Sequence, residues 1–182
     1  SLITEKTCAI VPVHVYGCVC DVEKIEGIAK KYGLKVIYDA AHAFDVRIGG
    51  RSIAEYGDVS MFSFHATKVF NTVEVGALVY HDQALTSKLR NLRNFGIESE
   101  ESVTAIGLNA KMNELCAAMG LCNLEVVDSA IARRKEIVSR YLTILNKISG
   151  IKTLNYDAMH DKGIEYNYAY MPIEIDPQLA GY

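Results

Sequence analysis

The stretch "DVEKIEGIAKKYG" (21–33), which lies between the apolar runs "CAIVPVH" (8–14) and "KVIYD" (35–39), decides the fold. Its apolar residues recur at helical spacing, at Val22, Ile25, Ile28 and Ala29. Asp21 is a suitable cap for the start of this helix, and Gly33 for its end. We therefore predict a strand, helix and strand with a right-handed crossover, the unit from which parallel sheets are built.

Two further apolar runs follow, "VSMFSF" (59–64) and "GALVYH" (76–81). All four runs are almost continuously apolar instead of alternating with polar residues, which is typical of strands buried on both faces. The sequence thus predicts an α/β protein whose sheet is covered by helices.

Helical patterns return at 83–94 and again at 110–149, where we expect an interruption near Asp128. The apolar faces of the second region come from Met112, Leu115, Met119, Ile131, Ile137, Tyr141 and Leu145. After Gly150 the residue pattern changes. The stretch "EYNYAYMPIEI" (165–175) mixes tyrosines with apolar residues, which predicts a strand. We interpret this part as the opening of a second domain.

The composition argues against several classes of function. The chain has 182 residues, with 19 basic and 22 acidic side chains and no basic stripe. Neither nucleic acid nor an anionic membrane is therefore an expected partner. No signal peptide or transmembrane segment is visible, and we expect a cytoplasmic protein.

The cysteine pattern favours free thiols in a reducing compartment. There are five cysteines: Cys8, Cys18, Cys20, Cys116 and Cys122. The Cys18-Val-Cys20 pair near His14 is compatible with a metal, but no spaced second pair accompanies it. We predict that the protein has no metal site.

Three polar residues fall at or just after the ends of predicted strands: Asp39, Ser63 and Lys68. In sheets built from βα units, ligands gather beyond the carboxyl ends of the parallel strands. Each residue also has an ordinary interpretation, because aspartate caps helices and turns, serine bonds its own backbone, and most lysines are surface charges. The stretch "DAAHAF" (39–44), for example, is equally compatible with a helix that Asp39 caps.

Taken together, four blocks resemble the DegT/DnrJ/EryC1/StrS family of pyridoxal-phosphate-dependent sugar aminotransferases. They are "VPVHVYG" (11–17), "VIYDAAHAF" (36–44), "YGDVSMFSFHATKVF" (56–70) and "GLNAKMNELCAAMGL" (107–121). The resemblance implies the three-layer α/β/α, mostly parallel large domain of the aspartate aminotransferase fold (fold type I), here incomplete. Residues 1–150 would form the C-terminal part of this pyridoxal-phosphate-binding domain, including its long interdomain helices, and 151–182 would begin the small C-terminal domain.

The resemblance also implies a role for each matching residue. Lys68 matches the lysine that binds the cofactor aldehyde and then moves a proton, which requires a neutral amine for part of the cycle. Asp39 matches the carboxylate that faces the pyridine nitrogen. His42 stands where many members have a glutamine near the phenolic oxygen, and Ser63 matches a phosphate-contacting hydroxyl. Asn109 matches an asparagine that reaches the phosphate in the neighbouring subunit, which implies a homodimer.

The implied reaction moves an amino group, from an amino-acid donor such as glutamate, to a nucleotide-linked keto sugar. The residues of these blocks most resemble those of members that act on dTDP-4-keto-6-deoxyglucose to make the 4-amino sugar of a bacterial surface polysaccharide. One branch of the family has histidine in place of the lysine and performs dehydration, so Lys68 favours amino transfer.

Two departures favour a different interpretation, an inactive fragment or interaction domain that keeps the fold. Val75 replaces the first glycine of the family's Glu-Gly-Gly-Ala, and it would be strained at a positive φ. The family's phosphate loop and its ring-stacking aromatic residue would precede Ser1, so we expect the 182 residues alone to be inactive. A dinucleotide-binding dehydrogenase domain would need a glycine fingerprint after a strand, and no glycines here have that spacing.

Overall fold

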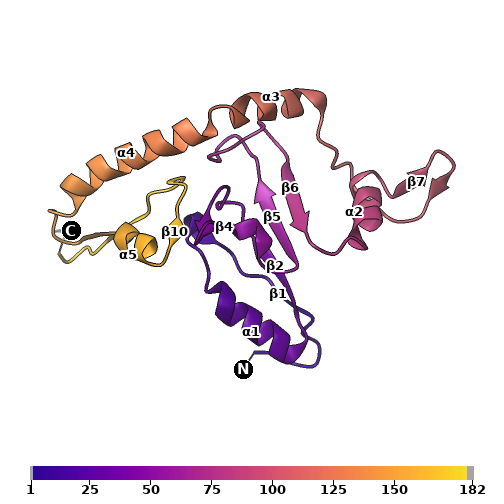
Figure 1. Cartoon of the computed structure of the whole chain (residues 1–182), viewed down its shortest axis with the longest axis horizontal. Helices are drawn as coiled ribbons and strands as arrows, with labels where there is room; N and C mark the ends of the chain where they lie inside the picture. The colour runs from indigo at the N-terminus through magenta and orange to yellow at the C-terminus, as the bar shows by residue number, and fades with distance from the viewer. Residues whose placement is uncertain (1, 180–182) are drawn as a thin grey trace.

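The computed structural model describes residues 2–179, and a four-stranded sheet lies at its centre (Figure 1). In spatial order its strands are β1 (Ala9–Ile10), β2 (Lys35–Asp39), β5 (Val59–Ser63) and β6 (Gly76–Tyr80). The first three strands run parallel and β6 runs antiparallel to β5. The predicted α/β class with a mostly parallel sheet is confirmed.

Helix α1 (Val22–Tyr32) begins and ends at the predicted caps. The Oδ1 of Asp21 accepts a hydrogen bond of 3.1 Å from the amide of Lys24. Gly33 has φ 65°, in the left-handed region, which glycine adopts without steric cost. Because these signals are local, the sequence alone locates both ends of the helix.

The predicted strand at 8–14 is shorter than expected, because only Ala9–Ile10 forms regular strand pairing. Pro12 has no amide hydrogen and cannot donate to a ladder. The chain nevertheless stays beside β2: the carbonyl of Pro12 accepts from the amide of Asp39, and the amide of His14 donates to the carbonyl of Asp39, both at 2.9 Å. This extension carries His14 to the carboxyl end of β2.

The hydrophobic core lies on one face of the sheet, under α1. Val36, Tyr38 and Phe62 point to this face and are buried against helix residues. The opposite face is uncovered in the described chain: Ile37 is 37% exposed and Leu78 47%. The continuous apolar pattern of the strands thus predicts a layer that residues 2–179 do not supply.

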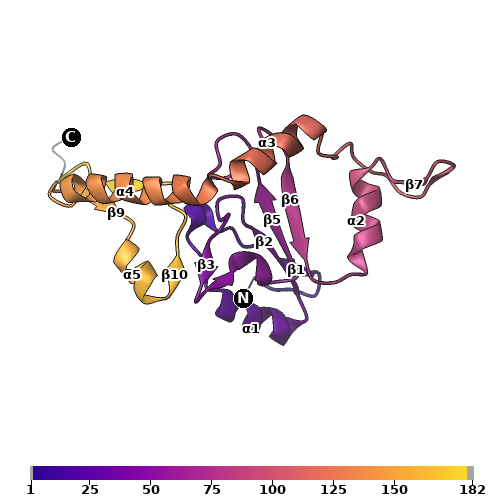
Figure 2. The ribbon, with the colours of Figure 1, turned by 45° about the horizontal axis from the view of Figure 1, so that its top comes forward.

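Beyond β6 the chain forms a helix, a hairpin and two long helices. These elements are α2 (Leu85–Arg93), β7 (Ile97–Ser99), β8 (Ser102–Val103), α3 (Glu114–Leu124) and α4 (Val127–Leu145). The predicted interruption near Asp128 lies slightly earlier, between Leu124 and Val127, where the helix axis bends by 61°. Helix α4 extends away from the sheet on the side opposite α2 and β7 (Figure 2).

The prediction of a single strand at 165–175 is wrong. The chain instead forms two separate strands, β10 (Ile164–Glu165) and β11 (Ile173–Ile175). Tyr168 between them has φ 51°, which breaks an extended run. The first strand pairs with β3 (Arg47–Ile48) and so returns the chain to the large sheet region.

The remaining elements are short. Strand β9 (Ile151–Thr153) pairs with β11, α5 (Tyr156–Asp161) follows it, and β4 (Arg51–Ser52) pairs with β3. Two 3₁₀ turns, η1 (Val15–Gly17) and η2 (Ile53–Glu55), complete the described chain.

Within residues 2–179, no single helix has both the length and the apolar character needed to cross a membrane. Helices α3 and α4 reach those limits only when they are taken together as a bent pair.

Candidate active site

Asp39 ends β2 and holds the neighbouring turn rather than a helix. Its Oδ1 accepts a hydrogen bond of 3.0 Å from the amide of Ala41, and residues 40–46 form turns. The interpretation of "DAAHAF" as a capped helix start is therefore wrong. Among the described residues, this amide is the one hydrogen-bond donor to the carboxylate, so Oδ2 is left to accept from a ligand.

Lys68 lies on the loop between β5 and β6, whose ends are joined by backbone bonds. The amide of Phe64 donates to the carbonyl of Val75 at 2.9 Å, and that of Ala66 to Val73 at 2.8 Å. The Nζ of Lys68 donates to the Oη of Tyr170 at 3.3 Å. The lysine is thus half-buried and held by a residue that comes from a distant segment.

His42 is close enough to Lys68 and Asp39 for both charges to act on its ring. Its Nδ1 accepts a hydrogen bond of 3.0 Å from the amide of Tyr16, and its ring centroid lies 4.5 Å from that of Tyr170. Burial lowers the pKa of His42, and the positive charge of Lys68 lowers it further, against the opposing effect of Asp39. A neutral imidazole whose Nδ1 accepts carries its proton on Nε2 and can donate from there.

The segment Tyr166–Tyr170 completes the site, although its sequence pattern does not mark it as part of one. Asn167 is 1% exposed, and its Nδ2 donates to the carbonyls of His42 at 3.0 Å and Phe44 at 2.8 Å. Its Oδ1 accepts from the amide of Ala169 at 3.0 Å. One buried amide therefore ties this segment to the turn that carries His42.

The backbone at Gly17 lies very close to His42 and Tyr166, which lets the segment Tyr166–Tyr170 pack against the turn that carries His42. Gly17 has φ 83°, and a Cβ added there would lie 2.9 Å from the carbonyl oxygen of His42 and 3.1 Å from the ring of Tyr166. The Oη of Tyr166 in turn donates to the carbonyl of Tyr16 at 2.5 Å. Only glycine allows both the conformation and the spacing at this position.

His14 lies behind Asp39 and is fully buried. Its ring stacks on that of Tyr38 at a centroid distance of 4.6 Å, and its Nδ1 accepts from the amide of Cys20 at 3.1 Å. Burial lowers the pKa of His14 to about 4, although the nearby charge of Asp39 opposes the shift. The residue is therefore a neutral part of the core at physiological pH.

The other two predicted site residues, Ser63 and Asn109, interact locally in the described chain. Ser63 ends β5, where its Oγ accepts from the amide of His65 at 3.4 Å, the local interaction that serine often makes. Asn109 is exposed and forms an isolated bridge with Asn94. No hydrogen bond or ring contact among residues 2–179 joins either side chain to Lys68, Asp39 or His42.

Val75 follows the lysine loop in a conformation that β-branched residues rarely adopt. Its φ is 82°, and that of Val73 is 71°. The sequence left open whether the position of Val75 requires a positive φ. The structure answers that it does, so the valine is strained where a glycine would not be.

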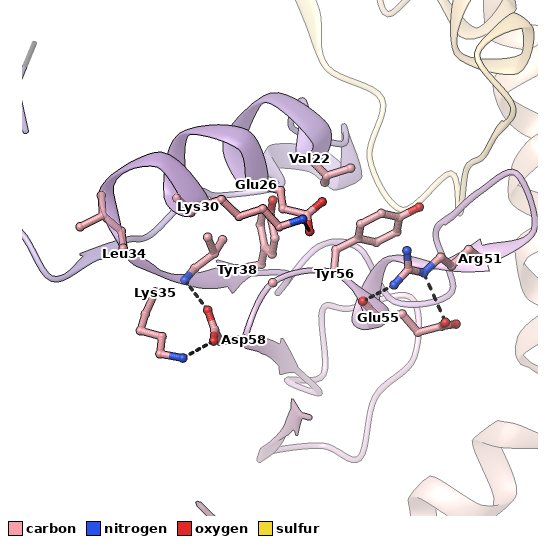
Figure 3. A pocket seen from close by; sticks show the side chains of 14 residues that line it. Val22, Glu26, Lys30, Leu34, Lys35, Tyr38, Arg51, Glu55, Tyr56 and Asp58 are labelled. Atoms are coloured by element: carbon pink, nitrogen blue, oxygen red, sulfur yellow. Dashed lines mark hydrogen bonds and ion pairs between the residues drawn. The ribbon is translucent and has the colours of Figure 1, made fainter. Parts of the chain in front are cut away.

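A cavity of about 490 Å³ lies elsewhere, between α1, the side chains of Lys35, Val36 and Tyr38 on β2, and the turn after β4 (Figure 3). Its charged side chains form pairs with one another: Lys30 with Glu26, Lys35 with Asp58 and Arg51 with Glu55. These pairs leave no unpaired charge to select a ligand, and none of the predicted site residues lines the cavity.

The cysteines are all unpaired, as predicted. The Cys18 to Cys20 stretch uses its groups locally, since the Sγ of Cys20 donates to the carbonyl of Val13 at 3.2 Å. In the part of the chain that the structure describes, no three His, Cys, Asp or Glu side chains are grouped to hold a metal ion.

The model of the DegT/DnrJ/EryC1/StrS aminotransferase family matches residues 1–180. The chain belongs to this family. A dTDP-4-amino-4,6-dideoxy-D-glucose transaminase of Shigella dysenteriae is 43% identical over 174 residues, which cover 96% of this chain and 46% of that protein. A GDP-perosamine synthase of Escherichia coli O157:H7 is 36% identical over 160 residues, covering 87% and 44%.

A solved structure of DesI, determined in the presence of its TDP-sugar product, superimposes with a TM-score of 0.89 at 36% identity. The match covers 99% of this chain and 45% of that chain. This family member therefore spans about half the length of the relatives it matches, and its fold over that half is the family's fold.

Proposed function

We propose that the full-length protein is a pyridoxal-phosphate-dependent aminotransferase that moves an amino group from glutamate to a nucleotide-linked keto sugar. Among such sugars we propose a dTDP-4-keto-6-deoxyhexose, since a transaminase that makes the corresponding 4-amino sugar is 43% identical. The product would serve the synthesis of a surface polysaccharide, and the enzyme would work in the cytoplasm of a bacterium.

One observation carries this proposal: the amine of Lys68, the ring of His42 and the carboxylate of Asp39 gather at the carboxyl edge of the sheet. Lys68 and His42 share a contact with Tyr170, and the charges of Lys68 and Asp39 both act on the imidazole. An amine, a neutral hydrogen-bond donor and a carboxylate are the groups that a pyridoxal ring requires around it.

The donor set fits the cofactor at each of these three atoms. The Oδ2 of Asp39 is left to accept from a protonated ring nitrogen, and the Nε2 of His42 is left to donate to a phenolic oxygen. Lys68 would hold the aldehyde carbon. When bound, pyridoxal phosphate supplies a ring that accepts the electrons left on the substrate carbon after a proton departs.

Within this chain each residue then has a separate task. The carboxylate of Asp39 would face the ring nitrogen and so favour the protonated ring. The neutral His42 orients the ring without adding a second positive charge near Lys68. Once an amino donor has taken its place on the aldehyde carbon, the Nζ of Lys68 would be free to accept the proton that leaves the donor's carbon and to deliver it to the former aldehyde carbon, which is general acid–base catalysis.

Phosphate binding and the subunit arrangement belong to the same proposal. Ser63 would donate its hydroxyl to the phosphate of its own subunit, and the exposed Asn109 would reach the phosphate of a partner subunit in a homodimer. Residues 1–150 would form part of the large domain, and 151–182 would begin the small one. Residues 180–182 of that second part lie outside the described residues.

The test is to trap the cofactor on the full-length protein. The protein is incubated with pyridoxal phosphate, reduced with borohydride and mapped by peptide mass spectrometry. We expect a pyridoxyl adduct on Lys68 that is absent from Lys68→Ala. Lys152→Ala is a suitable control, because Lys152 lies on β9 and its amine pairs with Glu174 at 3.6 Å, away from all the proposed site residues.

The competing function is a catalytically inactive member that keeps the fold, and the strained Val75 is the observation that favours it. The same experiment separates the two. Labelling of many lysines without preference for Lys68 would support the inactive member and contradict the aminotransferase.

A further inference from the structure

We infer that Tyr170 is the positioning residue for the amine of Lys68, and that its hydroxyl holds this amine in both the charged and the neutral state. The inference rests on the proposed function, in which Lys68 must alternate between these states. Tyr170 is not among the residues that the sequence blocks pointed to.

The contact itself is specific. The Oη of Tyr170 lies 3.3 Å from the Nζ of Lys68, and this is the one side-chain hydrogen bond of the amine within residues 2–179. The amine lies 5.9 Å from the centre of the same ring, so it approaches the hydroxyl and not the aromatic face. The hydroxyl is therefore the group that fixes where the amine points.

A phenol suits this task because it is both a donor and an acceptor. When Lys68 is charged, its ammonium donates a hydrogen bond to the Oη of Tyr170. When Lys68 is neutral, the phenolic hydrogen can turn to donate to the lone pair of the amine. A carboxylate at this position would only accept, and would stabilise the charged lysine; a second ammonium would only donate.

The ring of Tyr170 is itself held in place from several sides. It packs on His42 with a centroid distance of 4.5 Å and on Tyr16 with 5.7 Å. Its carbonyl accepts from the Oη of Tyr166 at 3.2 Å. His42 lies in the turn after Asp39, and Tyr16 lies in η1, whose preceding residue His14 donates its amide to the carbonyl of Asp39. The position of the phenol is therefore coupled to that of the carboxylate.

The backbone of the segment is fixed as well. The pairing of Glu165 with Arg47 attaches its start to β3, and the amide of Asn167 fixes its middle. Near its end, the Nη1 of Arg134 on α4 donates to the carbonyl of Ala169 at 3.3 Å. A phenol anchored in this way restricts the flexible lysine side chain at little further entropic cost.

The test measures the reactivity of Lys68 in cofactor-free protein, so it does not depend on activity. Full-length wild type, Tyr170→Phe and Tyr168→Phe are pulsed with acetic anhydride at pH 8, and each lysine is quantified by peptide mass spectrometry. Tyr168→Phe is the matched control, because it removes a hydroxyl two positions away that makes no hydrogen bond among the described residues. Labelling of the exposed Lys152 in the same molecules corrects for reagent concentration.

We expect Lys68 to be acetylated roughly fivefold faster in Tyr170→Phe, the factor that corresponds to the net loss of one hydrogen bond. The rates in Tyr168→Phe should match wild type. An unchanged rate in Tyr170→Phe would overturn the inference. Equal acceleration in both variants would overturn it too, because it would mean that the segment merely loosens.

Two further measurements keep the outcome clear. Thermal unfolding checks that Tyr170→Phe, which retains the ring on His42, is folded. If it is not, Tyr170→Leu and Tyr170→Trp are compared by the same labelling. A folded variant in which Lys68 is acetylated at the wild-type rate contradicts the inference. The two claims fail in different experiments. If the proposed function is wrong, borohydride trapping gives no adduct on Lys68, whereas the acetylation rates still test the contact with Tyr170 because they do not require the cofactor.

Discussion

The carbonyl of Val75 accepts a 2.9 Å hydrogen bond from the amide of Phe64 while Val75 itself holds φ at 82°. The bond closes the loop that carries Lys68, so the strained conformation persists because the loop requires it. A β-branched residue in this region costs on the order of 1–3 kcal/mol. A glycine would remove this strain, but it would also make the unfolded chain more flexible, which cancels part of the gain in stability.

We therefore predict that Val75→Gly raises the free energy of unfolding by about 1 kcal/mol, measured by urea denaturation. Val103→Gly is the control, because Val103 lies in strand β8 and has no positive φ. We expect that substitution to destabilise by roughly 0.5–1 kcal/mol. A loss of stability in Val75→Gly as large as in Val103→Gly would contradict the account of strain.

Removing the amide of Asn167 should destabilise the protein. Asn167→Ala leaves the carbonyls of His42 and Phe44 without the donor that they share, and we expect a loss of roughly 2–3 kcal/mol in unfolding free energy. Asn146→Ala is a fair comparison, since Asn146 is exposed and makes no side-chain hydrogen bond among residues 2–179. Similar losses in the two variants would mean that Asn167 does not fix the segment.

The free energy of unfolding should decrease as the pH is lowered from about 6.5 to 4, because of His14. Its pKa is about 4 when folded and 6.5 in the ordinary state, so between these values the unfolded chain binds more protons. The contribution of His14 is thus fully present above pH 6.5 and is lost as the pH falls toward 4. It amounts to about 3 kcal/mol.

Urea denaturation of His14→Asn at pH 7 and pH 4.5 checks this expectation. The asparagine keeps an acceptor for the amide of Cys20 but has no ring to protonate, so its stability should change less than that of wild type over this range. His81→Gln, at an exposed position, should retain the full dependence. Parallel pH profiles for wild type and His14→Asn would rule out the assignment.

His42 should act as a hydrogen-bond donor to the cofactor. We predict that His42→Leu weakens pyridoxal phosphate binding by roughly 10-fold or more, because it removes a donor to a charged oxygen. His42→Gln, which restores an N–H, should weaken binding less. Equilibrium titration of the full-length protein by cofactor absorbance measures both, and equal losses would show that the ring fills space only.

The elements that local signals define were the ones predictable from sequence. Asp21 and Gly33 marked both ends of α1, and the continuous apolar residues of β2 marked its limits. By contrast, the mixture of tyrosines after Glu165 predicts one strand, because aromatic residues favour strands in general. What decides the structure there is the side chain of Asn167, which bonds carbonyls more than 120 positions earlier.

The candidate site divides in the same way. Lys68, Asp39 and His42 were found because they stand in recognisable blocks, and the structure brings them together. Tyr170 lies in no such block, and its role depends on the pairing of β10 with β3. The one signal for that segment was its density of tyrosines, which does not by itself say what they contact.

The uncovered face of the sheet should make the 182-residue chain associate. Ile37 and Leu78 expose apolar surface there, and such surface favours contact with another molecule. We predict that the isolated chain forms concentration-dependent oligomers by analytical ultracentrifugation, and that Leu78→Lys reduces them. Ile28→Lys on α1, where 43% of the side chain is exposed, should have less effect. Equal effects would place the association elsewhere.

The 102 positions that separate Lys68 from Tyr170 also have a consequence during synthesis. At about 5–20 residues per second, the ribosome needs roughly 5–20 s to make the chain between them. Throughout that interval the hydroxyl of Tyr170 has not yet been made and cannot hold the amine. The amine is thus chemically free in the nascent chain and acquires its restraint only when translation of this region is nearly finished.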